Sequence, residues 1–107
     1  MAVKDNPKIR EAAHNIQNHY RPEKIILFGS WASGEADQNS DIDFLVIKNT
    51  AEKFLSRTKR VRKIIGASVE ADVIVYTPKE LKKSLDSGNF FTQDIVKSGK
   101  VLYDKKS

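Results

Sequence analysis

Two aspartates separated by a single residue, Asp41 and Asp43, are the side chains of this 107-residue chain whose spacing most directly suggests chemistry. They stand at the start of an apolar run, Phe44 to Ile47, which is typical of a buried strand. Side chains alternate across a strand, so both carboxylates are expected on the same face of a sheet. Adjacent carboxylates repel each other, and a hard cation such as Mg²⁺, which prefers oxygen ligands, would neutralise them.

A turn of small residues, Gly29-Ser30, ends ten residues before Asp41 and follows a second apolar run, Ile25 to Phe28. Glycine accepts positive φ and lets the backbone approach phosphate oxygens closely. The Ser30 hydroxyl and the amides that open the following turn are able to donate hydrogen bonds to a phosphate tail. Turn and carboxylates together predict a site for a nucleoside triphosphate with a divalent metal ion.

A third carboxylate should join the pair if the strand predicted over residues 69–76 lies parallel to the one that follows Asp41. A helix predicted between these strands, over residues 51–65, makes a parallel pair with a right-handed crossover the expected arrangement. Asp72 then lies beside the two aspartates, and Glu70, which has the same facing parity, is the competing candidate. Three carboxylates at one sheet edge would suit one or two metal ions that clamp a phosphoryl group during in-line displacement.

Alternating strand and helix patterns predict a small α/β (α+β) fold, with helices packed on a mixed sheet. Helices are expected over residues 7–20, 51–65, 78–85 and 89–98, a helical turn over 31–33, and strands over 24–28, 41–47, 69–76 and 101–103. Thr77 should cap the 78–85 helix, with Pro78 at its first position. The pairing of 24–28 with 41–47 stays open between parallel and antiparallel.

Apolar spacing also predicts which helical residues face the core. The expected buried residues are Ile9, Ala13, Ile16 and Tyr20 on the first helix, Phe54, Leu55, Thr58, Val61 and Ile65 on the second, and Phe90, Phe91 and Ile95 on the last. Partner binding by part of the face formed by Phe90, Phe91 and Ile95 is the alternative. The basic residues Lys53, Arg57, Lys59, Arg60, Arg62 and Lys63 are interpreted mainly as the solvated face of the 51–65 helix, with a nucleic-acid-binding surface as the alternative.

Bulk composition is typical of one folded domain over residues 1–107, with a core of about residues 7–103. Hydrophobic content of 39% and charged content of 31% do not describe a disordered chain. Apolar runs of four residues are too short to cross a bilayer, and the N-terminus has no signal-peptide pattern. With no cysteine in the chain, a cytoplasmic location is expected.

Three segments carry a resemblance to a known family. Phe28-Gly29-Ser30-Trp31-Ala32-Ser33-Gly34, Ser40-Asp41-Ile42-Asp43-Phe44-Leu45-Val46 and Ala71-Asp72-Val73-Ile74-Val75 resemble the minimal nucleotidyltransferase family of the DNA polymerase β-like superfamily. The resemblance spans residues 7–103. It implies that Gly29, Ser30 and Ser40 bind the nucleotide, and that Asp41, Asp43 and Asp72 are the catalytic and metal-binding set for two Mg²⁺ ions. The reaction it implies is transfer of AMP from ATP to a hydroxyl group, with Asp72 helping to activate that hydroxyl.

Stand-alone family members of this size resemble antitoxins that adenylylate a tyrosine of a HEPN-domain ribonuclease toxin. The resemblance therefore implies ATP and a HEPN toxin as partners. The apolar helices predicted at the C-terminal end are compatible with a homo-oligomer or a hetero-complex, and neither a membrane nor nucleic acid is expected as a partner.

The chain departs from the family pattern at two positions. Many members have arginine where this chain has Trp31 and Ser33, and losing two cations weakens the expected grip on a triphosphate. Trp31 is interpreted mainly as an amphipathic cover over the turn, with stacking on a base as the alternative. Two further functions stay open: an inert module that neutralises its partner by binding alone, and a basic nucleic-acid-binding domain.

Overall fold

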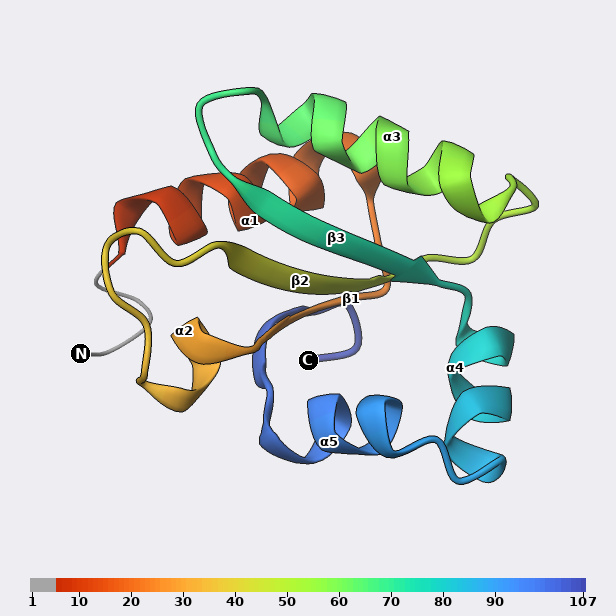
Figure 1. The fold of residues 1–107 in the computed structure, drawn as a ribbon. Coiled ribbons are helices and arrows are strands. Elements are labelled where there is room, and N and C mark those ends of the chain that lie inside the picture. Colours follow the sequence, from red (N-terminus) through yellow and green to blue (C-terminus); the bar gives the residue numbers. More distant parts are fainter. Residues whose placement is uncertain (1–5) are drawn as a thin grey trace.

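The structure, a computed structural model, describes residues 6–107. Its sheet has the strand order β3-β2-β1-β4, formed by β1 (Lys24–Phe28), β2 (Ile42–Ile47), β3 (Ala71–Tyr76) and β4 (Lys100–Asp104). Strand β1 is antiparallel to β2 and β4, whereas β2 and β3 are parallel. The helices are α1 (Pro7–Tyr20), α2 (Ser30–Ser33), α3 (Phe54–Ile65), α4 (Pro78–Asp86) and α5 (Phe90–Ser98) (Figure 1).

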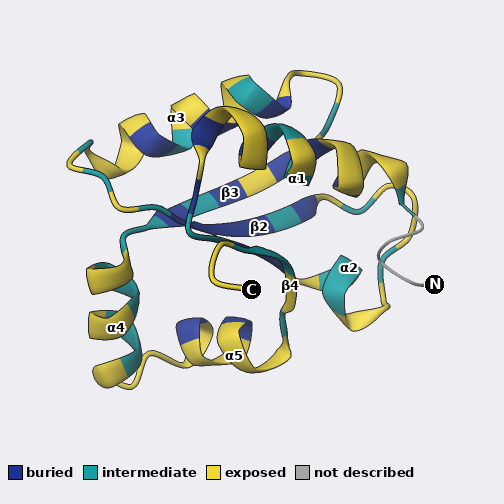
Figure 2. Cartoon of the chain, turned by 180° about the vertical axis from the view of Figure 1, so that it is seen from behind, coloured by how far each residue is buried: buried dark blue, intermediate teal, exposed yellow. Residues whose placement is uncertain are grey.

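The helices cover the two faces of the sheet unequally. Helices α1 and α3 lie on one face, and α4 and α5 lie on the other (Figure 1). The first face holds the larger core, with buried residues from both helices and the three strands β1, β2 and β3 (Figure 2). Among residues 6–107, the buried apolar cluster on the second face consists of Ile26, Leu45, Ile47 and Ile95. The second face therefore has the smaller core.

The predicted strand pairing is confirmed, since β2 and β3 are parallel and joined through α3, and β4 is an edge strand. Helix α3 begins at Phe54, three residues later than predicted, and β3 begins at Ala71, two residues later. Thr77 caps α4 in a capping box with Glu80, and Pro78 is its first residue, as predicted. No helix among residues 6–107 is long and apolar enough to cross a membrane.

The predicted buried face of α3 is wrong at its N-terminal end. Phe54 and Leu55 are 44% and 70% exposed, and Arg57 is buried instead. Val61 and Ile65 are buried as predicted, and a helical row at four-residue spacing that contains them also places residue 57 inward. On α1, the buried position is Ala12 rather than Ala13, which is half-buried.

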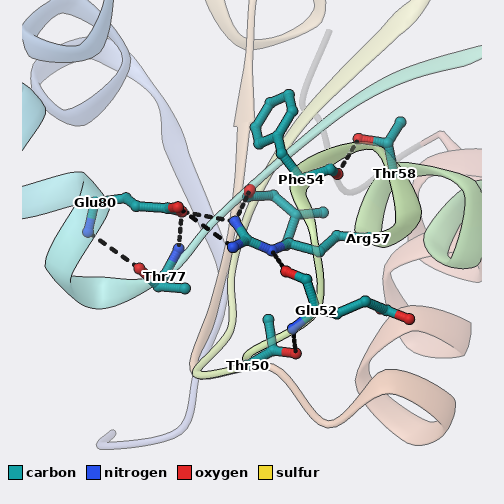
Figure 3. A network of polar contacts seen from close by, with 8 residues as sticks. Thr50, Glu52, Phe54, Arg57, Thr58, Thr77 and Glu80 are labelled. Carbon is teal, nitrogen blue, oxygen red and sulfur yellow. Dashed lines mark hydrogen bonds and ion pairs between the residues drawn. The ribbon is translucent and has the colours of Figure 1, made fainter.

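The buried Arg57 is accommodated because each of its three guanidinium nitrogens donates a hydrogen bond (Figure 3). Its Nε donates to the carbonyl of Glu52 (2.7 Å), and its Nη1 donates to the carbonyl of Val75 (3.2 Å). It also forms a two-pronged ion pair with Glu80, at 2.6 and 3.3 Å. The basic run of α3 is thus not uniformly a solvated face, because Arg57 joins α3 to β3 and α4.

The prediction that α5 covers the sheet with three apolar residues holds only in part. Ile95 is 3% exposed and packs against the second face, as predicted. Phe90, at 86% exposed, is a wrong prediction, and Phe91 is half exposed with its ring edge-on to Phe28. The inward row of this short helix runs through Thr92 and Ile95, which leaves Phe90 at the N-terminus beyond the sheet.

Candidate active site

The turn between β1 and α2 has the backbone conformation that its glycine predicts. Gly29 has φ 74° and ψ −155°, a region that is occupied almost only by glycine. Its carbonyl accepts from the amides of Ala32 and Ser33, both at 3.1 Å, which starts α2. The amides of Ser30 and Trp31 come before those of Ala32 and Ser33 at the start of α2. The first amides of a helix have no acceptor within the helix, so these two are available to a ligand.

Gly29 also brings the turn into direct contact with a carboxylate. A Cβ built on Gly29 would overlap Asp43 Oδ2, so no larger residue fits while Asp43 keeps its position. The close approach arises because Phe28 pairs with Asp43 in the antiparallel β1–β2 register. The small-residue turn and the carboxylate, predicted to belong to one site, lie together.

The parallel register between β2 and β3 aligns two of the predicted carboxylates. Asp43 is the Cα partner of Asp72, so both side chains lie on the same sheet face as Leu45 of the smaller core. Asp43 is half-buried, whereas Asp41, which precedes β2, and Asp72 are exposed. Glu70 lies just before β3, where its carbonyl accepts from the amide of Ile42 at 3.1 Å.

Asp43 has an electrostatic environment that favours a nearby cation. Burial raises the pKa of Asp43, and the negative charges of Asp72 and Asp41 raise it further. Arg62, one of the basic residues predicted on the solvated face of the 51–65 helix, has its Nη1 4.0 Å from Asp72 Oδ1. Its Nη1 donates to the carbonyl of Ala71 at 2.6 Å, which places the guanidinium at the edge of the site.

Asp43 and Asp72 lie side by side on neighbouring strands, and Asp41 precedes β2, so the three carboxylates (the carboxylate row) do not enclose a metal site by themselves. Within residues 6–107, no group of three or more Asp, Glu or His side chains is arranged to hold a metal ion by itself. This arrangement still fits the donor set that Mg²⁺ uses, because Mg²⁺ is usually bound through one or two carboxylates plus substrate phosphates and water. The oxygen donors of Asp41, Asp43 and Asp72 match that chemistry.

Trp31, which follows the Gly29-Ser30 turn, is hydrogen-bonded to Ser40 in the loop before β2. Trp31 is half-buried against the larger core, and its Nε1 donates to the carbonyl of Ser40 at 3.0 Å. This agrees with Trp31 as an amphipathic cover. The hydroxyl of Ser40 accepts from the amide of Asp37 at 3.1 Å, within the loop that leads to β2. A nucleotide contact of Ser40 stays a prediction.

Two hollows lie near the ends of the strands that carry the site residues. One is lined in part by Asp72 of β3 and the other in part by Phe28 of β1. The hollow on the β3 side has a volume of about 700 Å³, and the charged residues that line it are Asp41, Arg62, Lys63, Glu70 and Asp72. The hollow on the β1 side measures about 360 Å³ and includes Gly29, Ser30, Glu35 and Asp94 in its lining. Glu35 and Asp94 were not predicted from the sequence, because no spacing connects them to the motifs. Arg62 was predicted only as part of the basic face of the 51–65 helix.

Comparison with known proteins gives sequence relatives over most of the chain. "Putative protein adenylyltransferase MJ1305" from Methanocaldococcus jannaschii is 37% identical over 87 residues, which are 76% of this chain and 58% of that protein. "Putative protein adenylyltransferase MJ0604" from the same organism is 29% identical over 103 residues, which are 94% of this chain and 100% of that protein. The chain thus spans less than two thirds of the first relative and the whole of the second.

Two solved structures share the fold. A protein of Sulfolobus solfataricus described as "a putative nucleotidyltransferase" superposes with a TM-score of 0.65 at 18% identity, covering 99% of this chain and 83% of that one. A chain from a structure of "the toxin-antitoxin with AMP-PNP" superposes with a TM-score of 0.63 at 18% identity, covering 94% of this chain and 76% of that one.

The family described as "Polymerase beta, Nucleotidyltransferase" matches residues 10–107, which include the turn, the carboxylate row and the whole sheet. This protein therefore belongs to the polymerase β-like nucleotidyltransferase family.

Proposed function

We propose that this protein is an Mg²⁺-dependent nucleotidyltransferase that transfers AMP from ATP to a hydroxyl group of a partner protein. The observation that carries the proposal is the contact between the Gly29 turn and Asp43, which is itself in register with Asp72. Phosphoryl transfer needs a phosphate-binding turn next to carboxylates that are able to hold a metal ion, and this fold places Gly29 beside Asp43. The names of the two archaeal relatives support AMP as the transferred group.

Each of these residues has a defined task in the proposed reaction. The Ser30 hydroxyl and the first amides of α2 hold the phosphate tail, and Asp41 and Asp43 would hold Mg²⁺. When bound, Mg²⁺ neutralises the triphosphate charge and stabilises the leaving pyrophosphate. The acceptor oxygen attacks the α-phosphorus, the bond to the bridging oxygen of the pyrophosphate breaks, and Asp72 takes the hydroxyl proton.

We further propose that the acceptor is a tyrosine of a HEPN-domain toxin, which makes this protein an antitoxin acting in the cytoplasm. The support is the resemblance of its motifs to stand-alone members of the family. The similarity of its fold to a chain of a toxin–antitoxin structure that contains AMP-PNP agrees with this partner and with ATP.

The test is an adenylylation assay with ATP, Mg²⁺ and the toxin encoded beside this protein, read as a mass gain of one AMP on the toxin. Asp43→Asn and Asp41→Asn should abolish the product, because each removes a metal ligand. Asp72→Asn should abolish it as well, whereas Glu70→Gln should retain it, which separates the two candidates for the third carboxylate. Asp86→Asn, on the exposed surface of α4, is the matched control. Undiminished product from Asp43→Asn would refute the proposal.

An inert module that neutralises its partner by binding is the second candidate. It is favoured by Trp31 and Ser33, which replace the arginines of many members, and by the use of Trp31 for packing. Under this alternative, Asp41→Asn and Asp43→Asn would still protect cells that express the toxin. Loss of protection in both variants, with normal protein levels, supports catalysis.

A further inference from the structure

We infer that the exposed side of α3 docks the acceptor protein, and that it recognises an acidic surface on that partner. The inference rests on the proposed function, since it assigns a place to the acceptor of the same reaction. We call this side of α3 the docking face and define it by Leu55, Lys59, Arg62 and Lys63. None of these residues belongs to the motifs assigned to the nucleotide.

The four residues of the docking face lie along one side of the helix. Lys59 follows Leu55 by four positions, and Arg62 and Lys63 follow Lys59 by three and four, which are the spacings that bring helical side chains together. All four are exposed, Leu55 at 70%, whereas the buried residues of α3 lie on its other side. The helix therefore presents one apolar residue and three cations as a single stripe.

The positive charge of the docking face is largely uncompensated. Helix α3 contains no Asp or Glu, and its two other basic residues are paired with acids of neighbouring segments. Within residues 6–107, Lys59 and Lys63 take part in no ion pair, and Arg62 reaches only Asp72, across 4.0 Å. Carboxylates on a partner would complement the charge of this face.

The docking face leads to the side of the site from which the acceptor must arrive. In an in-line displacement, the attacking and leaving oxygens lie on opposite sides of the phosphorus. The Gly29-Ser30 turn holds the pyrophosphate end in the proposed function, so the acceptor hydroxyl comes from the β3 side. There, Arg62 and Lys63 line the hollow of about 700 Å³ together with Asp72, the residue proposed to take the hydroxyl proton.

A protein surface fits this face better than a nucleic acid does. The hollow at the end of the face is also lined by Asp41, Glu70 and Asp72, whose negative charges would repel a phosphate backbone. A protein is able to place carboxylates on the lysines and a neutral hydroxyl at Asp72. At the other end of the face, Leu55 offers the apolar contact that the centre of a protein interface uses.

The test uses the toxin encoded beside this protein as the acceptor and measures its binding by calorimetry at low and at physiological salt. Lys59→Glu and Lys63→Glu should each weaken binding roughly threefold to tenfold at low salt, as expected when an exposed attraction becomes a repulsion. The loss should shrink at higher salt, because exposed charges are screened. In the adenylylation assay, Lys59→Glu should raise the KM for the acceptor and leave kcat and the KM for ATP unchanged, because Lys59 lies outside the hollow.

Lys79→Glu is the matched control, because it makes the same change of charge at an exposed position of α4. Equal acceptor affinity in Lys59→Glu, Lys63→Glu and this control would overturn the inference. A single-stranded RNA that wild-type protein binds more tightly than it binds the acceptor, with affinity lost in Lys59→Glu, would overturn it in favour of a nucleic-acid surface.

The docking face and the proposed function fail separately. If wild-type protein adenylylates the acceptor and Lys59→Glu does so with an unchanged KM, the docking face is refuted and the proposed function stands. If the acceptor binds in a way that depends on Lys59 but no AMP is transferred, the proposed function fails, and the docking face is the interface of an inert module.

Discussion

A single glycine determines how closely the phosphate-binding turn approaches the carboxylates. Gly29 combines a positive φ with space that Asp43 Oδ2 occupies. Gly34, which ends α2, also has a positive φ, of 84°, but a Cβ there would meet nothing within 4 Å. A side chain at Gly34 would therefore meet only the backbone penalty of a positive φ, whereas a side chain at Gly29 would also collide with Asp43.

We predict that Gly29→Ala destabilises the protein by about 1–3 kcal/mol from backbone strain alone, and that it also weakens Mg²⁺-dependent ATP binding because Asp43 must move. Gly34→Ala should show a smaller backbone penalty, because Gly34 is in the left-handed helical region, and normal ATP binding. Denaturant unfolding gives the first quantity and calorimetry the second. Equal ATP affinity in both variants would contradict a role for the close approach at Gly29.

At the scale of the elements, the Arg57–Glu80 ion pair connects α3 to α4 across the end of β3 (Figure 3). Arg57 is only 6% exposed, while the Glu80 side chain is 43% exposed. The hydrogen bond from Arg57 lowers the pKa of Glu80 the most. Burial, the next largest effect, raises this pKa, while hydrogen bonds with Thr77 and the positive charge of Arg57 lower it further. Glu80 thus serves both the helix cap and the buried guanidinium.

We predict that Glu80→Gln lowers the free energy of unfolding at pH 7 by about 1 kcal/mol, a value reduced from that of a buried charged hydrogen bond because Glu80 is partly exposed. Since the folded pKa is depressed, the stabilisation is fully present above the unfolded value of about 4.3. It is lost as pH falls through the lower folded value.

The stability difference between wild-type protein and Glu80→Gln should therefore shrink in urea titrations as the pH falls below about 4. Asp86→Asn, which breaks an exposed pair with Lys82, should cause no measurable change at any pH. A Glu80→Gln deficit that grows towards low pH would contradict this account.

The elements themselves were largely predictable, and so was part of what the helices bury, such as Ile16, Val61 and Ile95. The burial of Arg57 and the exposure of Phe54 and Phe90 were not. The Asp43–Asp72 alignment followed from strand alternation and from a helix long enough for a parallel crossover. The inward turn of Arg57 depends on partners that come from Glu52, Val75 and Glu80, so no local pattern around α3 reveals it. The position of Asp94 beside the Gly29 turn likewise depends on where α5 packs, 65 residues further along the chain.

At the scale of the whole molecule, the two faces of the sheet differ in how much of the fold they support. The face under α1 and α3 contains most of the buried apolar residues, and the face under α4 and α5 contains four (Figure 2). Ile95 is the buried apolar residue that α5 contributes, while Phe90 of the same helix is 86% exposed.

We predict that Ile95→Ala lowers the free energy of unfolding by about 2–5 kcal/mol, as expected for a buried isoleucine, even though Ile95 belongs to the smaller of the two buried clusters. Phe90→Ala removes a larger side chain but should change stability very little, because its ring is already in solvent. Thermal or urea unfolding of both variants tests this directly. A loss from Phe90→Ala as large as that from Ile95→Ala would mean that α5 is packed differently.

The register that places Asp43 opposite Asp72 is the same register that places Phe44 opposite Val73 in the larger core. Slippage of β3 by one position would turn Asp72 away from Asp43 to the opposite layer and move Val73 out of the larger core. Misfolded copies of this chain therefore lose catalytic competence and solubility at the same step. A cell that removes aggregating copies would, by the same act, remove the inactive ones.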